Sequence, residues 1–456
     1  MSASAPLPVS VNSLTVPTMP ASKSRISLGK TLSTIPGVPV RVTNGNAGDH
    51  SEIQHLLSAV FQAPSRDSFL ASLEEPLYEP TDRLLVERAG KIVSHVHLLK
   101  REMHFESERF PASVVSWLGT LPEFRSQGYA GALMDEAERQ MLAEGAQLGF
   151  LSTKIPHFFR PGGWAVCGRH SHSTAGTRDV LAELSRQSER LKQRPLTIRP
   201  WRQVELPTLM RIYHENTARG TGPWCRNESY WRWLITRNTT DQFWVAIEGP
   251  DKMELDQTNS PIVGYAISRD DQVLEAMAFP DHPTAELLLL GRACSEAIER
   301  DSHSITVHAR PGSELHEICR LAGGTNHCHE VEQGQVFMAK LLAPLRFLKG
   351  LRPLIRERAI RAGIPLPSEL GLLVEGEKYH IKVTRRGAVV SRDKTGRSYL
   401  NMNIAEFTRL LLGHLDLDPA IAQGRIEAST RVAVETAAAL FPRLPLWRSP
   451  LEDGMG

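Results

Sequence analysis

Apolar and polar positions from residue 39 onward follow the periods of strands and helices in turn. After Asp49, a residue type that favours helix N-caps, apolar side chains recur at i, i+3 and i+4 spacing. Residues 82–97 alternate about Ala89–Lys91, which predicts a hairpin of two strands. A further strand is expected at 114–120, and a helix and short strand follow it. Residues 39–180 therefore predict an α/β unit in the order strand, helix, helix, three strands, helix, strand, helix.

The same order of elements recurs over residues 181–342, after a connecting helix expected at 179–192. Residues 343–456 differ: a basic helix at 346–361 precedes two paired strands, and residues 400–413 run from a strand into a helix that Gly413 caps. Residues 1–38 are rich in Ser, Pro, Thr and Ala, which predicts a disordered tail. An organelle transit peptide is the alternative for this segment.

Composition narrows the class of protein. The chain has 456 residues, of which 41% are hydrophobic and 23% charged, as in soluble globular proteins. A net charge of +2 gives no argument for nucleic acid. Five scattered cysteines fit a reducing compartment rather than a disulfide framework. No apolar run is long enough to cross a bilayer and no secretion signal is evident, so we expect a cytoplasmic protein with no membrane partner.

The segment from Val114 to Met134 carries the most specific chemistry. A strand leads into Arg125-Ser-Gln-Gly-Tyr-Ala130, and this loop opens a helix. The first helical turn offers free N–H groups and a positive dipole end. Gly128 lets the backbone approach an anion closely, and Arg125 adds a permanent charge. The segment therefore predicts a diphosphate cradle, with an ordinary strand-to-helix turn as the alternative.

This Arg-x-x-Gly-x-Ala pattern resembles the pyrophosphate loop of the GNAT family of N-acetyltransferases. The flanking Leu118–Arg125 and His157–Trp164 segments resemble the same family. The resemblance implies acetyl-CoA as co-substrate. The residues expected to bind it are Leu118, Gly119, Thr120, Arg125, Ser126, Gln127, Gly128, Tyr129, Ala130 and Gly131.

Two such halves followed by a different C-terminal unit resemble the Eis (enhanced intracellular survival) type of acetyltransferase. The implied fold is α/β (α+β), with tandem GNAT folds built on mixed central sheets and a sterol-carrier-protein-like α+β domain after them. The expected division is a tail (1–38), a GNAT domain with the acetyl-CoA loop (39–180), a degenerate GNAT-like domain (181–342) and the sterol-carrier-like domain (343–456). The resemblance also implies an amine acceptor and a homo-oligomer, often a hexamer.

The second GNAT-like copy lacks the cradle. Pro280–Glu286 occupies its place with neither the Arg nor the Gly, and Asp281 and Glu286 would repel a diphosphate. We therefore interpret this copy as architectural; a divergent second active site is the alternative.

The residues that would move protons are less clear in the sequence. The family's Tyr-x-x-x-Gly-aromatic string places its acid at Phe159, which has no proton to give. His157 is the nearby alternative acid or base, although it also reads as an ordinary loop histidine, and Cys167 is a poorer one. The family's base is the chain's terminal carboxylate, here that of Gly456. Glu452 and Asp453 lie close to it in an acidic tail that solvent alone could explain.

A histidine- and cysteine-rich stretch lies at residues 316–329. His316, Cys319, His327, Cys328 and His329 lack standard zinc spacings, and we expect no metal. The resulting hypothesis is an acetyl-CoA-dependent N-acyltransferase acting on an amine by direct attack on the thioester. Alternatives are a catalytically weakened acyl-CoA- or lipid-binding sensor or scaffold, and a lipid carrier led by the C-terminal unit.

Overall fold

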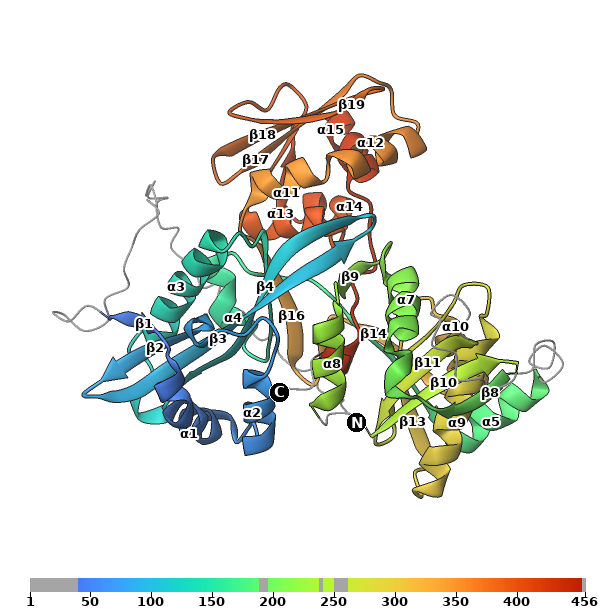
Figure 1. Cartoon of the computed structure of the whole chain (residues 1–456). Helices are drawn as coiled ribbons and strands as arrows, with labels where there is room; N and C mark the ends of the chain where they lie inside the picture. The colour runs from blue at the N-terminus through green and yellow to red at the C-terminus, as the bar shows by residue number, and fades with distance from the viewer. Residues whose placement is uncertain (1–39, 188–195, 238–240, 250–260, 453–456) are drawn as a thin grey trace, which may run out of the picture.

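The computed structural model describes residues 40–187, 196–237, 241–249 and 261–452, and shows a mixed α/β fold with three sheets (Figure 1). The predicted tail at residues 1–38 lies outside the described residues, as does the end of the expected connecting helix. The helices of these described residues include none with the length and hydropathy of a membrane-spanning segment.

The first sheet contains the predicted hairpin and the strand that leads into the loop. Its order is β1-β2-β3-β4-β5-β16-β15, with β9 paired to β3 and β6 paired to β16. The strands are β1 (Val42–Asn44), β2 (Arg83–Arg88), β3 (Lys91–Phe105), β4 (Glu108–Thr120), β5 (Leu148–Thr153), β6 (Ala165–Val166), β9 (Thr221–Trp224), β15 (Val331–Glu332) and β16 (Gln335–Leu341).

Helices cover both faces of this sheet. Successive side chains of a strand point to opposite faces, and here both faces carry apolar side chains that must be buried. Helices α1 (His50–Phe61) and α2 (Arg66–Leu73) bury Ile53, Leu57 and Phe69 against one face. Helix α3 (Tyr129–Ala143) packs its apolar stripe on the other face, and the short α4 (Pro156–Phe159) adds Phe159 to the same core.

The second sheet has seven strands in the order β14-β7-β13-β12-β11-β10-β8. They are β7 (His170–Gly176), β8 (Leu196–Pro200), β10 (Gln242–Glu248), β11 (Ile262–Arg269), β12 (Gln272–Ala278), β13 (Ser304–His308) and β14 (Thr325–His329). The helices of this unit are α5 (Thr177–Arg186), α7 (Leu206–Thr217), α8 (Glu228–Thr236), α9 (Thr284–Glu299) and α10 (Glu314–Leu321).

The two sheets exchange strands, which the repeated order of elements did not predict. Strand β7 lies within the predicted first unit, yet it pairs with β13 and β14 of the second sheet. Strand β16 lies near the end of the predicted second unit, yet it pairs with β5 of the first. The chain therefore crosses to the second sheet after β6, contributes β9 to the first sheet on the way, and returns to the first sheet after β14. The division of the chain into domains stays a prediction.

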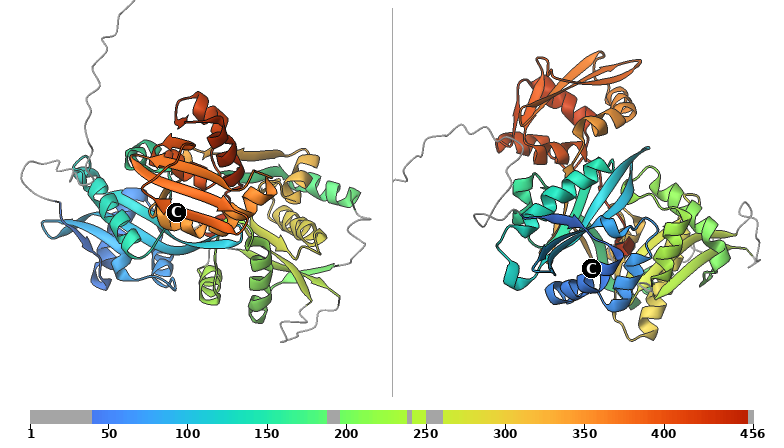
Figure 2. Two further views of the ribbon diagram at one scale, coloured as in Figure 1. Left: turned by 90° about the horizontal axis from the view of Figure 1, so that it is seen from above. Right: turned by 60° about the vertical axis from the view of Figure 1, so that its left-hand side comes forward.

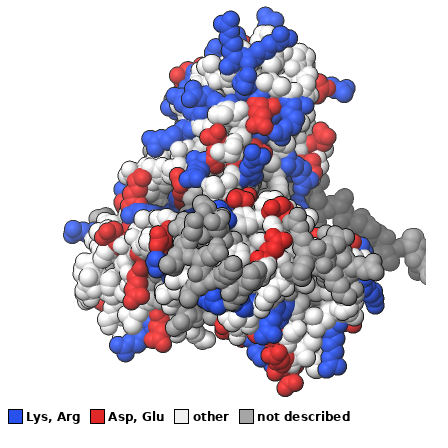
Figure 3. Space-filling model, turned by 45° about the vertical axis from the view of Figure 1, so that its right-hand side comes forward, with Lys and Arg blue, Asp and Glu red and all other residues white. Residues whose placement is uncertain are grey.

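The C-terminal part forms a separate layer with a five-stranded sheet (Figure 2). Its strands are β17 (Ser368–Val374), β18 (Glu377–Thr384), β19 (Gly387–Arg392), β20 (Tyr399–Met402) and β21 (Ile426–Ala428). Its helices are α11 (Pro344–Gly350), α12 (Arg352–Arg361), α13 (Ile404–Leu411), α14 (Leu417–Ala422) and α15 (Arg431–Leu440). Lys and Arg side chains gather over the visible face of this part (Figure 3).

Two sequence expectations for this part have different outcomes. The strand-to-helix run at 400–413 is confirmed, and Gly413 has the left-handed φ of +69° expected after a helix. The single helix expected at 346–361 is wrong, because two helices meet at Leu351. Gly350 packs directly on the Phe110 ring, and Pro353 favours the start of a new helix.

After α15 the chain returns as a tail, residues 441–452, that lies between the first and second sheets (Figure 1). The Trp447 N–H donates to the Thr221 carbonyl at 3.1 Å, and the Ser449 hydroxyl donates to the Leu274 carbonyl at 3.1 Å. These bonds attach the tail to β9 of the first sheet and to β12 of the second. The tail is therefore part of the contact between the two units.

Gly222 on β9 sets how closely the tail approaches. Its φ is +114°, and a Cβ there would lie 2.6 Å from the Trp447 carbonyl oxygen. We expect Gly222→Ala to lower the free energy of unfolding by about 2–4 kcal/mol through overpacking and backbone strain. Gly334→Ala is the matched control, because Gly334 has a φ of +80° but open space around it. Equal losses in the two variants, measured by urea unfolding, would contradict a specific tail contact.

Candidate functional site

The loop between β4 and α3 presents an uncapped helix N-terminus. Gly128 is the N-cap of α3, with a φ of +79°, and as a glycine it has no side chain that could cap the first turn. A Cβ on Gly131 in that first turn would meet nothing within 4 Å, so the side of the turn on which a Gly131 side chain would stand is open. An open, left-handed glycine turn at a helix start is the geometry that accepts an anion.

Strands β4 and β5 separate beside this loop. Their parallel ladder pairs Ala112–Val115 with Leu148–Leu151, and β4 then continues to Thr120 without pairing to β5. The β3–β4 register shifts between His95 and His97, so β4 carries a bulge, and Trp117 has a φ of +53°. A bulge bends its strand and disrupts the local ladder. The result is an opening in the ladder between the two strands, at the end of β4 that leads into the loop before α3.

The predicted acetyl-CoA residues lie at the end of β4 and in the loop that follows it, and their side chains differ in exposure and in hydrogen bonding. Arg125 is exposed, and its Nε donates to the Thr120 carbonyl at 3.3 Å, which holds the side chain over the loop. Ser126 is exposed and has a φ of +60°. Tyr129 is buried and its hydroxyl bonds to Arg88 and Gln127, so only its backbone faces the helix start.

Residues 118–120 at the end of β4, which are predicted to bind acetyl-CoA, also contact other parts of the first sheet and its helices. Gly119 lies against α1, where a Cβ would sit 2.8 Å from the Phe61 ring. The Gly119 carbonyl accepts a hydrogen bond from the Ser94 hydroxyl at 3.0 Å, and the Thr120 hydroxyl lies 2.7 Å from the same Ser94 oxygen. Leu118 is part of the core beside α3. Residues 118–120 therefore have packing roles in the first sheet, beside the binding roles expected for them.

The residues proposed for proton transfer are scattered. His157 lies on α4 and is exposed, whereas Phe159 is buried against Trp164. Cys167 is fully buried, and burial raises the pKa of its thiol far above the usual range, so it stays protonated. Gly456 and Asp453 lie outside the described residues.

Sequence reasoning missed a buried histidine beside the bulge. His97 on β3 pairs with Ser116, and its side chain is almost fully buried next to the Tyr78 ring. Within the part of the chain that the structure describes, neither ring nitrogen has a hydrogen-bond partner. Burial, with Arg83 adding repulsion, lowers the pKa of His97 well below its ordinary value, so the ring is neutral. Only the register of β3 on β4 places it here, and that register is not readable from sequence.

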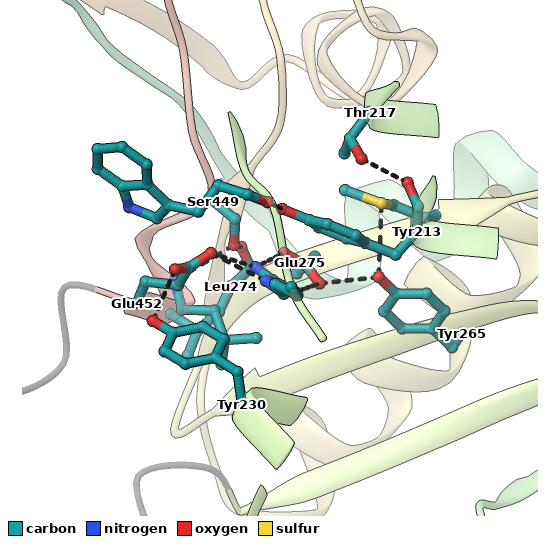
Figure 4. Close-up of polar contacts among 12 residues, drawn as sticks. Tyr213, Thr217, Tyr230, Tyr265, Leu274, Glu275, Ser449 and Glu452 are labelled. Carbon is teal, nitrogen blue, oxygen red and sulfur yellow. Dashed lines mark hydrogen bonds and ion pairs between the residues drawn. The ribbon is translucent and has the colours of Figure 1, made fainter. Parts of the chain in front are cut away.

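A buried ionic network holds the end of the tail (Figure 4). The Arg226 guanidinium donates to Glu275 on β12 and to Glu452 in the tail, each at 2.8 Å, and all three side chains are nearly inaccessible. The hydroxyl of Tyr230 donates to Glu452 at 2.9 Å, and that of Tyr265 donates to Glu275 at 2.8 Å. Glu452, which the sequence suggested as part of a solvated acidic tail, is therefore buried. Its partners lie far away in sequence, so no local pattern signals them.

The histidine- and cysteine-rich stretch divides between two elements. His316 and Cys319 lie on α10, and the other three residues lie on β14. His316 bonds to the hydroxyls of Ser171 and Ser173. Among residues 40–452 outside the undescribed gaps, no group of three or more His, Cys, Asp or Glu side chains is placed to hold a metal ion.

Comparison with known proteins agrees with this geometry. Residues 41–167 match the family model of the acetyltransferase (GNAT) domain, a range that contains the loop, the bulge and the separation of β4 from β5. A search of curated proteins gives no match.

Solved structures resemble nearly the whole chain. A probable N-acyltransferase of unknown function from Enterococcus faecalis V583 has a TM-score of 0.70 at 16% identity, covering 90% of this chain and 98% of its own. A GCN5-related N-acetyltransferase from Anabaena variabilis ATCC 29413 has a TM-score of 0.69 at 16% identity, with 90% and 98% covered. Eis1 from Mycobacterium abscessus has a TM-score of 0.59 at 13% identity, with 90% and 99% covered. At these identities the likeness shows the fold.

Proposed function

We propose that this protein is an acetyl-CoA-dependent N-acyltransferase. The observation that carries the proposal is the left-handed Gly128 at the start of α3, with open space beside Gly131, next to the separated strands β4 and β5. The diphosphate of acetyl-CoA would accept hydrogen bonds from backbone N–H groups of residues 126–131, and Arg125 would add charge. The pantetheine arm would enter the opening beside β4. The match of residues 41–167 to the GNAT domain supports this reading.

The chemistry needs few side chains once both substrates are held. A neutral amine attacks the thioester carbon, the C–S bond breaks, and the amine proton leaves as coenzyme A departs as the thiol. Backbone N–H groups at the bulged end of β4 would polarise the thioester carbonyl. Positioning supplies most of the acceleration, so the absence of a hydroxyl at Phe159 does not preclude turnover.

For the proton acceptor we propose the chain end at Gly456, with His157 as the second candidate. The buried Arg226–Glu452 contact fixes the chain four residues before that end, between the two units. The same family resemblance carries the proposals of a cytoplasmic homo-oligomer and a sterol-carrier-like C-terminal domain.

A thiol-release assay with acetyl-CoA tests the enzyme assignment. We expect turnover on at least one amine from a panel of polyamines, lysine peptides and aminoglycosides. A chain ending at Glu452 should then lose at least about tenfold in kcat if the Gly456 carboxylate is the base, while His157→Gln remains near wild type. The reverse pattern would assign the role to His157. Saturable acetyl-CoA binding without turnover on any amine would instead favour the sensor or scaffold alternative.

A further inference from the structure

The second sheet contains its own opening between parallel strands. Strands β12 and β13 pair only at Gln272–Thr306 and Val273–Val307, and then separate. A cavity of about 290 Å³ lies there. It is lined from β12 by Glu275, Ala276 and Met277, and from the end of β13 by His308, Ala309 and Arg310. The position corresponds to the opening between β4 and β5 in the first sheet.

This cavity is not built for a diphosphate. Glu286, in the first turn of α9, lines the cavity and accepts a hydrogen bond from the backbone of Ala278 at the end of β12. A carboxylate of the chain itself thus lies in the first turn of α9, where it would repel a diphosphate, as the sequence suggested for Pro280–Glu286. A ligand of this cavity must satisfy a carboxylate on that side.

Acidic and basic side chains both line the cavity. Burial raises the pKa of Glu286 to about 7, although Arg310 attracts its charge. Within the described residues, neither Glu286, Arg310 nor Arg219 forms an ion pair, and all three line the cavity.

The other two lining carboxylates are already in ion pairs. Glu275 is paired with Arg226 at 2.8 Å, and Glu106 is paired with Arg358 at 2.7 Å. What remains for a ligand is one carboxyl group and two guanidinium groups.

We propose that this cavity binds a small zwitterion that carries both an ammonium and a carboxylate group, the chemistry of an amino acid. The ligand carboxylate would pair with Arg310 or Arg219, because guanidinium matches a carboxylate in two parallel hydrogen bonds. The ligand ammonium would pair with Glu286. A ligand bearing only one of these charges would form an ion pair with one wall only.

The tail and β9 of the first sheet form further walls, which link the cavity to the first unit. Leu444, Pro445 and Trp447 line the cavity, and Trp447 also lines a small pocket beside β5 of the first sheet. A ligand in the second sheet therefore contacts the segment that runs on to Glu452. Binding should stabilise the tail in its place between the two units.

Isothermal titration of the full chain at neutral pH with single L-amino acids tests the proposal. At least one should bind saturably, and its decarboxylated amine and its deaminated acid should each bind at least about tenfold more weakly. Glu286→Gln and Arg310→Met should each weaken the amino acid by a similar factor. Their acetyl-CoA affinity should match wild type, which separates this site from the proposed active site and shows that both variants fold.

Three results would overturn the proposal. One is the absence of saturable heat for every amino acid up to about 10 mM. Another is an affinity that both substitutions leave unchanged, which would place the amino acid elsewhere, for example at the acceptor site. The third is tight binding of the deaminated acid that depends on Arg310 but not on Glu286, which would mark a simple anion site.

Discussion

Gly128→Glu should weaken acetyl-CoA binding by at least about 100-fold in isothermal titration. A Cβ in the left-handed conformation costs about 1–2 kcal/mol. A carboxylate about 4 Å from a diphosphate charge adds a repulsion of about 4 kcal/mol at the effective dielectric of a protein surface. Because 1.4 kcal/mol corresponds to a factor of ten in affinity, this repulsion alone would weaken acetyl-CoA binding by more than the predicted 100-fold.

Gly424→Glu is the control for the backbone cost of this substitution. Gly424 has a φ of +69°, and open space surrounds it in the C-terminal part, far from the loop in sequence. It should bear a similar conformational penalty and retain wild-type acetyl-CoA affinity. If both variants bind acetyl-CoA as wild type does, the start of α3 is not the diphosphate site.

Arg226→Met should be the most destabilising single substitution in the contact between the two units. It leaves Glu275 and Glu452 buried without their shared cation, and removing one partner of a buried ion pair costs about 3–5 kcal/mol. We expect the midpoint of thermal unfolding to fall by on the order of 10 °C. The tail should also no longer be held between the two sheets, so we expect the turnover number to fall together with the midpoint of unfolding.

Arg431→Met provides the comparison for this substitution. Arg431 pairs with Glu435 on the surface of α15, where the arginine side chain is 91% exposed. Exposed pairs contribute at most about 1 kcal/mol, so its unfolding midpoint should stay close to wild type. Similar midpoints for the Arg226 and Arg431 variants would mean that the buried network does not hold the tail.

Local patterns predicted the elements that carry the proposed donor site. The β2–β3 hairpin, the strand into the loop and the helix after it are confirmed, because strand and helix periods and a glycine turn are encoded within short segments. The bulge at Trp117 was not predictable, since it depends on the register of β3 on β4. His97 was missed for the same reason.

Long-range pairings account for the rest of what the sequence could not show. The exchange of β7 and β16 between the sheets breaks the contiguous units that the repeated order implied. Arg226 meets Glu452 across 226 positions of chain, so nothing near Glu452 distinguished it from a solvated acid. The cavity between β12 and β13 needs walls from α7, α9 and the tail, and only the folded arrangement brings these together.

A crystal structure of the full chain grown with acetyl-CoA tests the central claim most directly. The account predicts diphosphate oxygens within about 3 Å of backbone nitrogens in residues 126–131, with the pantetheine arm between β4 and β5. Acetyl-CoA density at another surface, with the start of α3 empty, would contradict it.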